Sequence, residues 1–263
     1  MKFSIKRLLA MTALLAAVTV HAQSTELPPG AATGTLAFSG DAEMALSGTG
    51  VRPRAIEGVV GENSASYADL VLGLNFSSLV TTGNDVTSLL APNSWLSLER
   101  REFDEETGDV LRYSVFLADF EFDLAQSIVR AELFSLGADG EPTSLGHMAI
   151  FTASEIGLVG GTQGHVLQSG VDADGAPQYI ASGSLAGNLN MNTEATDLIL
   201  DNLNLGPGVG GNENEAVRNF WLGANWGAVS FTAAVVPELS TYAMFGLGLI
   251  GLGLVTRRRS QAA

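Results

Sequence analysis

Apolar and polar residues alternate along most of the chain between residues 34 and 235. The segment Asp119 to Leu124 (DFEFDL) alternates charged and apolar residues without a break. In residues 110–117, every second residue from Leu111 to Leu117 is apolar or aromatic, and in a strand these side chains share one face. A period of two is typical of half-buried strands whose other face meets water. The pattern therefore predicts antiparallel β structure for this part of the chain.

Turn-forming residues interrupt the alternation at intervals of roughly 8 to 15 residues. Phe103 to Asp109 (FDEETGD) predicts a hairpin loop, in which Gly108 takes a positive φ. The segment 209–215, rich in Gly and Asn, predicts a surface loop. The segments predicted as strands are residues 67–74, 94–100, 110–117, 119–124, 127–136, 145–152, 179–185, 195–203 and 218–235.

We therefore expect roughly ten to thirteen short strands and no long amphipathic helix outside the chain ends. No repeat of fixed period is visible, which disfavours a propeller or a solenoid. The fold class predicted for residues 34–235 is all-β, as a single antiparallel β-sandwich or jelly-roll-like domain.

The first 22 residues have the pattern of a secretory signal peptide. Lys2, Lys6 and Arg7 precede an apolar core, and the segment ends in Val-His-Ala with Ala22 last. Cleavage there leaves Gln23 at the start of the mature protein. Residues 23–33, which contain two prolines, predict a flexible leader.

A second apolar segment lies near the C-terminus. Residues 241–256 carry no charge, and Arg257, Arg258 and Arg259 follow them. As a helix this run is roughly 24 Å long, somewhat short of the ~30 Å hydrocarbon core. Snorkelling arginines make up part of the difference, and positive charge holds this end in the cytoplasm. Everything upstream is then expected on the other side of the membrane.

The segment 236–259 resembles the PEP-CTERM sorting signal of Gram-negative bacteria. That signal has a V-P-E-P-like motif, a short Gly/Leu-rich span and terminal arginines. Here Val236, Pro237, Glu238 and Ser240 match the motif region, whereas Leu239 replaces its usual second proline. The resemblance implies recognition by an exosortase, a membrane-embedded cysteine transpeptidase-like enzyme. It also implies transient insertion in the inner membrane, with biofilm or exopolysaccharide matrix as the setting.

Two other interpretations of this segment stay open. It matches an ordinary single-span anchor that is never cleaved, with residues 260–263 as a short tail. The glycines between residues 246 and 253 also suit a helix-dimerisation face.

Charge is distributed unevenly along the chain. Six of the 13 Lys and Arg residues lie in the two terminal segments, which leaves 7, whereas only Glu238 of the 28 Asp and Glu does, which leaves 27. Residues 23–236 therefore carry a formal charge of −20 and contain no lysine. So acidic a domain argues against nucleic acid as a partner. The absence of cysteine excludes disulfides and thiolate chemistry.

Two acidic clusters are candidate cation sites. Asp172, Asp174 and Gly175 match half of a calcium loop, but no bidentate glutamate follows at the required distance. A second cluster, Asp104 to Asp109, lies in the predicted hairpin loop. Both also fit solvated Asp/Gly turns. No cofactor is predicted, with Ca²⁺ as the open alternative.

Few residues support catalysis. The mature chain has two histidines, His147 and His165, and neither a G-x-S-x-G elbow nor a zinc-binding histidine pair. Paired carboxylates for glycoside hydrolysis stay open, because acids are abundant and their spacing on a sheet is not visible in the sequence. We expect no enzymatic activity, with a secreted hydrolase as an alternative.

Carbohydrate binding is another alternative. Aromatic side chains on a β-sandwich stack on sugar rings, and Trp95, Trp221 and Trp226 are the tryptophans available. Trp221 and Trp226 would face opposite sides of one unbroken strand, unless Gly223 forms a bulge. The sequence thus predicts an exported, non-enzymatic protein of the cell surface or matrix, with a carbohydrate- or calcium-binding module as the alternative.

Overall fold

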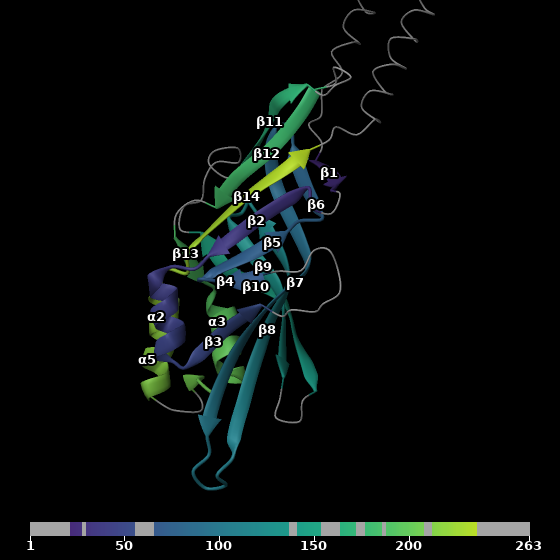
Figure 1. The fold of residues 1–263 in the computed structure, drawn as a ribbon. Helices are drawn as coiled ribbons and strands as arrows, with labels where there is room; N and C mark the ends of the chain where they lie inside the picture. Colours follow the sequence, from purple (N-terminus) through teal and green to yellow (C-terminus); the bar gives the residue numbers. More distant parts are fainter. Residues whose placement is uncertain are drawn as a thin grey trace, which may run out of the picture.

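The computed structural model describes residues 22–27, 30–55, 66–136, 141–153, 164–171, 177–185, 188–207 and 212–235. Fourteen strands form one hydrogen-bonded sheet, and all of its pairings are antiparallel (Figure 1). The strands are β1 Ala22–Glu26, β2 Ala32–Ala37, β3 Val51–Ala55, β4 Ser66–Ala68, β5 Val71–Asn75, β6 Ser78–Thr82, β7 Asp85–Phe103, β8 Val110–Asp123, β9 Ile128–Leu136, β10 Pro142–Ala153, β11 Gly164–Val171, β12 Pro177–Leu185, β13 Leu189–Met191 and β14 Ala228–Val235. The helices are α2 Gly40–Gly48, α3 Thr193–Asn202 and α5 Asn212–Gly223.

The sheet folds back on itself into two layers. Its main path runs β13-β10-β9-β8-β7 and then β11-β12-β14-β2-β5-β4. The two halves are joined between β7 and β11, where the register consists of the pair His165 and Asp85. Phe76, which follows β5, contacts Phe122 of β8 edge-on, with ring centroids 5.5 Å apart. The ring centroids of Phe76 and Phe231 of β14 are 6.4 Å apart. These rings fill the core between the layers, and the predicted β-sandwich is confirmed.

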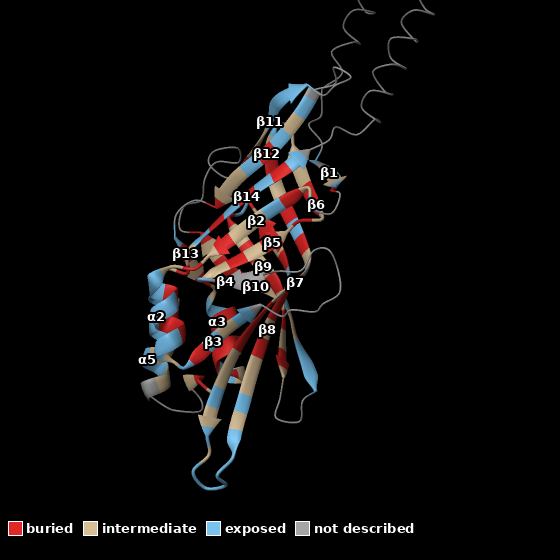
Figure 2. Ribbon diagram, in the orientation of Figure 1, coloured by how far each residue is buried: buried red, intermediate tan, exposed pale blue. Residues whose placement is uncertain are grey.

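The alternation in the sequence gives the buried faces of the central strands. Along β9, Val129, Ala131 and Leu133 are fully buried and the residues between them are half-buried, which is the alternation expected of the predicted strand 127–136. Buried residues, red in Figure 2, recur in this way along the central strands. The loop between β7 and β8 also has its predicted form, since Gly108 has φ +77°. Local patterning was sufficient here because neither feature depends on distant parts of the chain.

A bulge joins two of the predicted strands into one. Residues 110–117 and 119–123 belong to β8, whose register with β9 shifts between Ala118 and Glu121. Asp119 has φ +51° at this point. Buried Ser94 accepts a hydrogen bond from the Phe120 N–H (3.2 Å) and donates one to the Ala91 carbonyl. The serine thereby satisfies backbone groups that the bulge leaves out of the ladder.

Three predicted strands are wrong in part. The segment 67–74 is divided between β4 and β5, which pair with each other across a turn at Asp69 and Leu70, where φ is positive. Residues 195–203 lie mainly in helix α3, and the segment 218–235 begins in helix α5 before it becomes β14. Asn192 caps α3, since its side chain accepts a hydrogen bond from Glu194 N–H at 2.9 Å. Residues Ala195, Ile199 and Leu200 are buried on one side of α3, which is the spacing of a helix and not of a strand. The predicted loop 209–215 likewise overlaps the start of α5.

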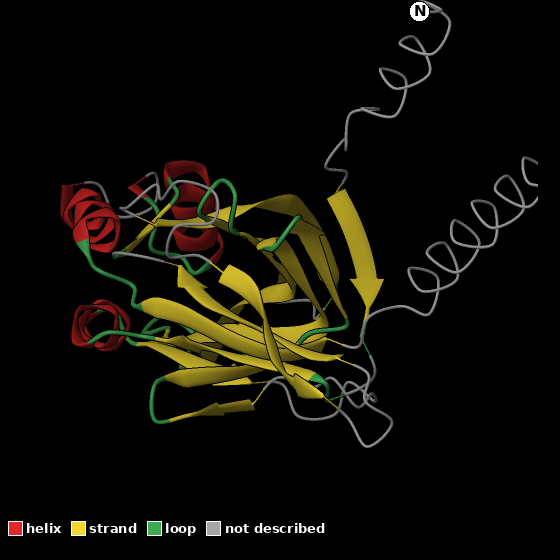
Figure 3. Ribbon diagram, turned by 90° about the horizontal axis from the view of Figure 1, so that it is seen from above, coloured by secondary structure: helices red, strands yellow, loops and turns green. Residues whose placement is uncertain are grey.

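The helices gather at one side of the strand layers (Figure 3). Helix α2 begins after Ser39, whose hydroxyl accepts from Asp41 N–H (3.1 Å). Helix α3 packs against β8 and β10, and against α5. No helix within the described ranges has the length and apolar character of a membrane span. The segment 236–263 lies outside those ranges.

The predicted leader is not a simple linker. Residues 22–26 form β1, which pairs with β6 from Ala22 opposite Thr82 to Glu26 opposite Ser78. Strand β2 begins at Ala32, two residues before the predicted start of the β domain. The described fold therefore extends to the predicted signal-peptidase site.

Candidate functional site

Four arginines share one outer face of the sheet. Cross-strand pairing places Arg52 of β3 opposite Glu99 of β7. It also places Arg101 of β7 opposite Arg112 of β8. Side chains of directly opposed residues lie on the same face, and residues two apart on a strand share it as well. Arg54, two residues after Arg52, joins this set, which we call the arginine face.

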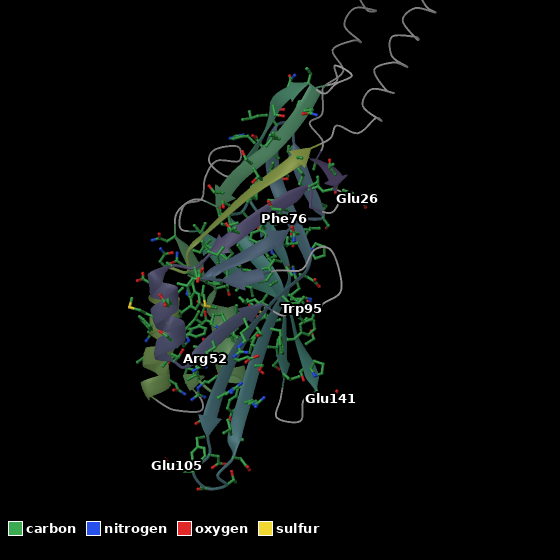
Figure 4. The ribbon with its side chains drawn as sticks, in the orientation of Figure 1. Glu26, Arg52, Phe76, Trp95, Glu105 and Glu141 are labelled. Atoms are coloured by element: carbon green, nitrogen blue, oxygen red, sulfur yellow. The ribbon has the colours of Figure 1, made fainter. Side chains whose placement is uncertain are left out.

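All four arginine side chains are exposed to solvent. The chain has 7 Lys and Arg residues between 23 and 236, so more than half of its cationic groups outside the termini lie on this face. Arg52 lies on β3 in the lower half of the molecule, between the helices and the β7–β8 hairpin (Figure 4). The face is a local cationic area on a strongly acidic domain.

Most of these cationic groups have no carboxylate partner. Arg54 Nε lies 3.6 Å from Glu99 Oε2. Within the described part of the chain, Arg52, Arg101 and Arg112 form no ion pair. Their charges are therefore available to an anionic ligand.

Arg100 shows the contrasting, structural use of an arginine. It points to the other side of β7, where Nη1 donates to the Leu203 carbonyl (3.1 Å), the Asn204 carbonyl (3.2 Å) and Glu102 Oε2 (2.9 Å). These carbonyls follow the C-terminus of α3, where a cation is favourable. Arg100 thus ties α3 to β7 and is not part of the arginine face.

Aromatic residues adjoin the arginine face on the same side of the sheet. Trp95 of β7 stacks on Phe134 of β9, with ring centroids 5.7 Å apart and an interplanar angle of 13°. Phe116 of β8 lies between them in register, opposite Phe134 on one side and Ser97 on the other. All three rings are half-buried and so keep accessible surface. Figure 4 shows Trp95 above Arg52, nearer the middle of the molecule.

Two hollows connect the arginines to their neighbours. The larger, of about 650 Å³, lies between α2, β3 and β7 and is lined by Arg52, Arg54 and Arg101 together with Glu43 and Glu99. The smaller, of about 430 Å³, is lined by residues of β7, β8 and the end of β9, including Arg112, Ser114, Phe116 and Leu136. Glu99 and Arg101 line both hollows. The two together form an open trough with Arg101 at its centre.

The outer face of β2 and β14 is chemically different. Its exposed or half-exposed side chains are the hydroxyls of Thr33, Thr35, Ser230 and Thr232, and Thr35 Oγ1 lies 3.1 Å from Ser230 Oγ. A shallow hollow of about 290 Å³ lies over them. These hydroxyls carry no charge, so this face has no group that selects an anion.

Two of the three predicted ligand-binding tryptophans form core. Trp221 is fully buried in α5 and Trp226 is 2% exposed, with ring centroids 5.1 Å apart. Trp226 Nε1 donates to the Trp221 carbonyl at 2.9 Å. The strand parity considered for this pair does not apply, because Trp221 lies in a helix. Surface stacking then depends on Trp95.

Each histidine lies beside a carboxylate. His165 Nδ1 is 3.0 Å from Asp85 Oδ1, and His147 Nε2 is 3.9 Å from Glu121 Oε2. Both pairs are partly exposed on the sheet, and neither lines the two hollows of the arginine face. Among the described residues, the trough therefore has no acid–histidine pair, which is one of the two arrangements considered for a hydrolase.

The acidic hairpin loop uses its key carboxylate for the turn. Asp104 Oδ1 accepts from the N–H of Glu106 (2.9 Å) and of Thr107 (3.4 Å). The hydrogen bond from Glu106, followed by one from the Thr107 side chain, lowers the pKa of Asp104. Among the described residues, no group of three or more potential ligands is placed to hold a metal ion. Asp172 and Asp174 lie outside those residues, so their calcium site stays a prediction.

The sorting motif also lies outside the described residues: Val236, Pro237, Glu238, Leu239, Ser240, Arg257, Arg258 and Arg259. Ala22 and Gln23, the predicted signal-peptidase site, lie at the start of β1. The arginine face was not identified from the sequence. The local sequence feature that points to this face is the two-residue spacing of Arg52 and Arg54, because residues two apart lie on the same side of a strand.

No family model matches this chain, and no curated protein does. Among solved structures, it is similar to the C-terminal domain of HtaA from Corynebacterium glutamicum, at 15% sequence identity and a TM-score of 0.41. That match covers 77% of this chain and 95% of the other. At this level of similarity no ligand or activity is transferred to this protein.

Proposed function

We propose that this chain is an exported, non-catalytic protein of the cell surface or extracellular matrix. In this proposal the N-terminal segment is a signal peptide, and the C-terminal segment anchors the domain in the inner membrane until an exosortase processes it. The ectodomain then contributes to the matrix by binding and not by turnover.

The observation that carries the proposal is the extent of the described sheet. The first described strand starts at Ala22 and the last ends at Val235. These residues border the predicted signal-peptidase site and the Val236-Pro237-Glu238 motif. The described strands of one sheet thus reach from one predicted processing motif to the other.

The positions of the first and last described strands support an anchored arrangement. The start of β1 and the end of β14 lie at the upper end of the molecule in Figure 1, whereas the β7–β8 hairpin loop lies at the lower end. In Figure 4, Glu26 lies in the upper half of the molecule, below β11 and β12, and Glu105 lies at its lower tip. An anchor that continues from Val235 would thus present the hairpin end away from the membrane.

The test is the intact mass of the exported protein from a host that has an exosortase and from the same host without it. We expect the mature protein to begin at Gln23 in both hosts, and to lack the terminal arginines when the enzyme is present. Pro237→Ala and Glu238→Ala should block this second step, whereas Glu215→Ala, an exposed change in α5, should not. A product that retains Arg259 in the presence of the enzyme would reduce the segment to a simple anchor, and a cytoplasmic product would refute export.

A carbohydrate-binding surface module is the second candidate function. The half-exposed Trp95–Phe134 stack favours it, because flat aromatic faces bind the apolar faces of sugar rings. A glycan array probed with the full chain and with Trp95→Ala tests this candidate. Loss of binding in the variant is the expected result, and equal binding by both proteins would refute a role for Trp95.

A further inference from the structure

We propose that the trough on the arginine face binds an acidic polysaccharide, with Arg52, Arg101 and Arg112 pairing with its anionic groups. The inference rests on the proposed function of an exported, matrix-associated protein and adds the ligand class and the binding site. It follows from the charge, the flanking apolar surface and the shape of the trough, and from its place on the molecule.

The charge of the trough selects an anion. Four arginines face two carboxylates, Glu43 and Glu99, in a domain whose overall charge repels anions. Arginine presents a planar fork of donors that matches carboxylate and sulfate oxygens. Arg101 and Arg112 lie directly opposite each other, and an anion held between them converts a repulsive pair into two attractive ones.

Apolar surface borders the arginines on both sides. Trp95, Phe116 and Phe134 lie toward the middle of the sheet. Phe103 and Val110, cross-strand partners near the hairpin loop, are 62% and 57% exposed. A polysaccharide matches this arrangement, since its charged substituents project from rings that have apolar faces. A small inorganic anion would use the arginines alone.

The shape of the trough suits a chain. The two hollows meet at Arg101 and are open to solvent, so a ligand longer than one ring can lie across β3, β7 and β8. Neighbouring strands are about 4.8 Å apart, so the arginines of β3 and β8 are separated by roughly 10 Å. Such a span fits repeating anionic groups along one polymer.

An acidic peptide fits less well. The stretch of β7 from Leu96 to Arg100 is paired with β3 on one side and β8 on the other. Within the described ranges, this stretch of β7 therefore offers no open edge to which an extended peptide could add as a strand. Strand β3 pairs with β7 alone, so poly-glutamate is included in the test to measure peptide binding. Anionic lipid is also disfavoured, because the arginine face lies toward the end of the molecule opposite to β1 and the end of β14 (Figure 1).

The test measures binding of the full chain in detergent to polygalacturonate, with neutral dextran, inorganic sulfate, poly-glutamate and anionic lipid vesicles as comparison probes. We expect saturable binding to polygalacturonate that weakens as salt rises, and much weaker binding to the other probes. The double variant R101Q/R112Q should lose about tenfold or more in affinity, as expected for removal of charge-assisted hydrogen bonds. The control R130Q/R218Q makes the same change in net charge and alters arginines paired with Asp123 and Asp197, so it should bind as the parent does.

Folding of each variant is checked by its circular dichroism and melting temperature. Where R130Q/R218Q is destabilised, the single variants R112Q and R218Q are compared instead, and only R112Q should weaken binding. Phe103→Ser, an exposed change, should weaken polymer binding without changing the response to sulfate. Equal affinity of R101Q/R112Q and the parent would overturn the proposal. Binding of sulfate, poly-glutamate or vesicles as tight as that of polygalacturonate would overturn the assignment of the ligand.

The outcomes of the binding experiment are independent of those of the export and processing experiment. Binding is measured with purified chain and needs no exosortase, whereas processing is read from the mass of the exported protein. A chain that binds polygalacturonate but keeps its C-terminus would refute sorting alone. A processed chain that binds no acidic polymer would refute this inference alone.

Discussion

Arg101 of β7 lies directly opposite Arg112 of β8, although both carry a positive charge. Opposed like charges on neighbouring strands destabilise a sheet. Neither arginine is paired with a carboxylate within the described residues. The unliganded domain therefore retains an unfavourable interaction at the centre of the trough.

Removing one charge of this pair should stabilise the domain. We expect Arg112→Gln to raise the free energy of unfolding by about 0.2–1 kcal/mol at low salt, because it ends the repulsion from Arg101. Urea unfolding at low and high salt measures the change. The gain should shrink as salt screens the pair in the parent protein.

Arg130→Gln is the control for that experiment. Arg130 Nη1 lies 2.9 Å from Asp123 Oδ2, so its loss removes an attractive interaction. We expect no gain in stability from this variant. If Arg112→Gln and Arg130→Gln change stability in the same direction, repulsion across β7 and β8 is not the cause.

The two core tryptophans should respond differently to replacement by phenylalanine. Trp226 Nε1 donates to the Trp221 carbonyl, whereas the buried Trp221 Nε1 has no hydrogen-bond partner among the described residues. Trp226→Phe therefore leaves a buried carbonyl unpaired, and Trp221→Phe removes an unpaired donor. We expect Trp226→Phe to be the more destabilising by about 1 kcal/mol in chemical denaturation. The reverse order would show that lost volume outweighs hydrogen bonding at this site.

Gly227 should not tolerate a side chain. It has φ +122°, and a Cβ there would lie 1.8 Å from the Ala37 carbonyl oxygen. We expect Gly227→Ala to lower the free energy of unfolding by about 2 kcal/mol or more, through backbone strain and displacement of β2. Gly40→Ala is the matched control, because a Cβ at Gly40 meets nothing within 4 Å. Equal melting temperatures for the two variants would contradict the expected clash.

The β7–β8 loop should lose order in acid. The pKa of Asp104 is lowered from its usual 3.8 by the Glu106 N–H first and the Thr107 side chain second. Because the folded pKa is below the unfolded one, the stabilisation is present above the usual value and is lost as pH falls through the lowered pKa. We expect amide hydrogen exchange at Glu106 and Thr107 to become faster as pH falls through the lowered pKa of Asp104. In Asp104→Ala, exchange at these two amides should be fast already at neutral pH. Equal exchange in the variant and the parent at neutral pH would show that another group holds the turn.

The sequence was sufficient where structure depends on near neighbours. The alternation in residues 128–136 predicts the buried face of β9, and Gly108 marks the hairpin loop, because side-chain parity and turn conformation are local properties. The segment 195–203 was assigned to a strand because its apolar residues fit two periods. Packing of Ile199 and Leu200 against the sheet, together with the Asn192 cap, makes it a helix.

The amino-acid sequence by itself determined an all-β domain, its acidic character and the two terminal motifs, since these depend on composition and short patterns. Only the tertiary structure decided that Trp221 and Trp226 are core and that Arg52 shares one face of the sheet with Arg101 and Arg112. Strand register sets such neighbours, and register depends on how distant segments pair. The arginine face thus depends on the pairing of β3 with β7, and the paired part of β7 lies about fifty residues later in the chain.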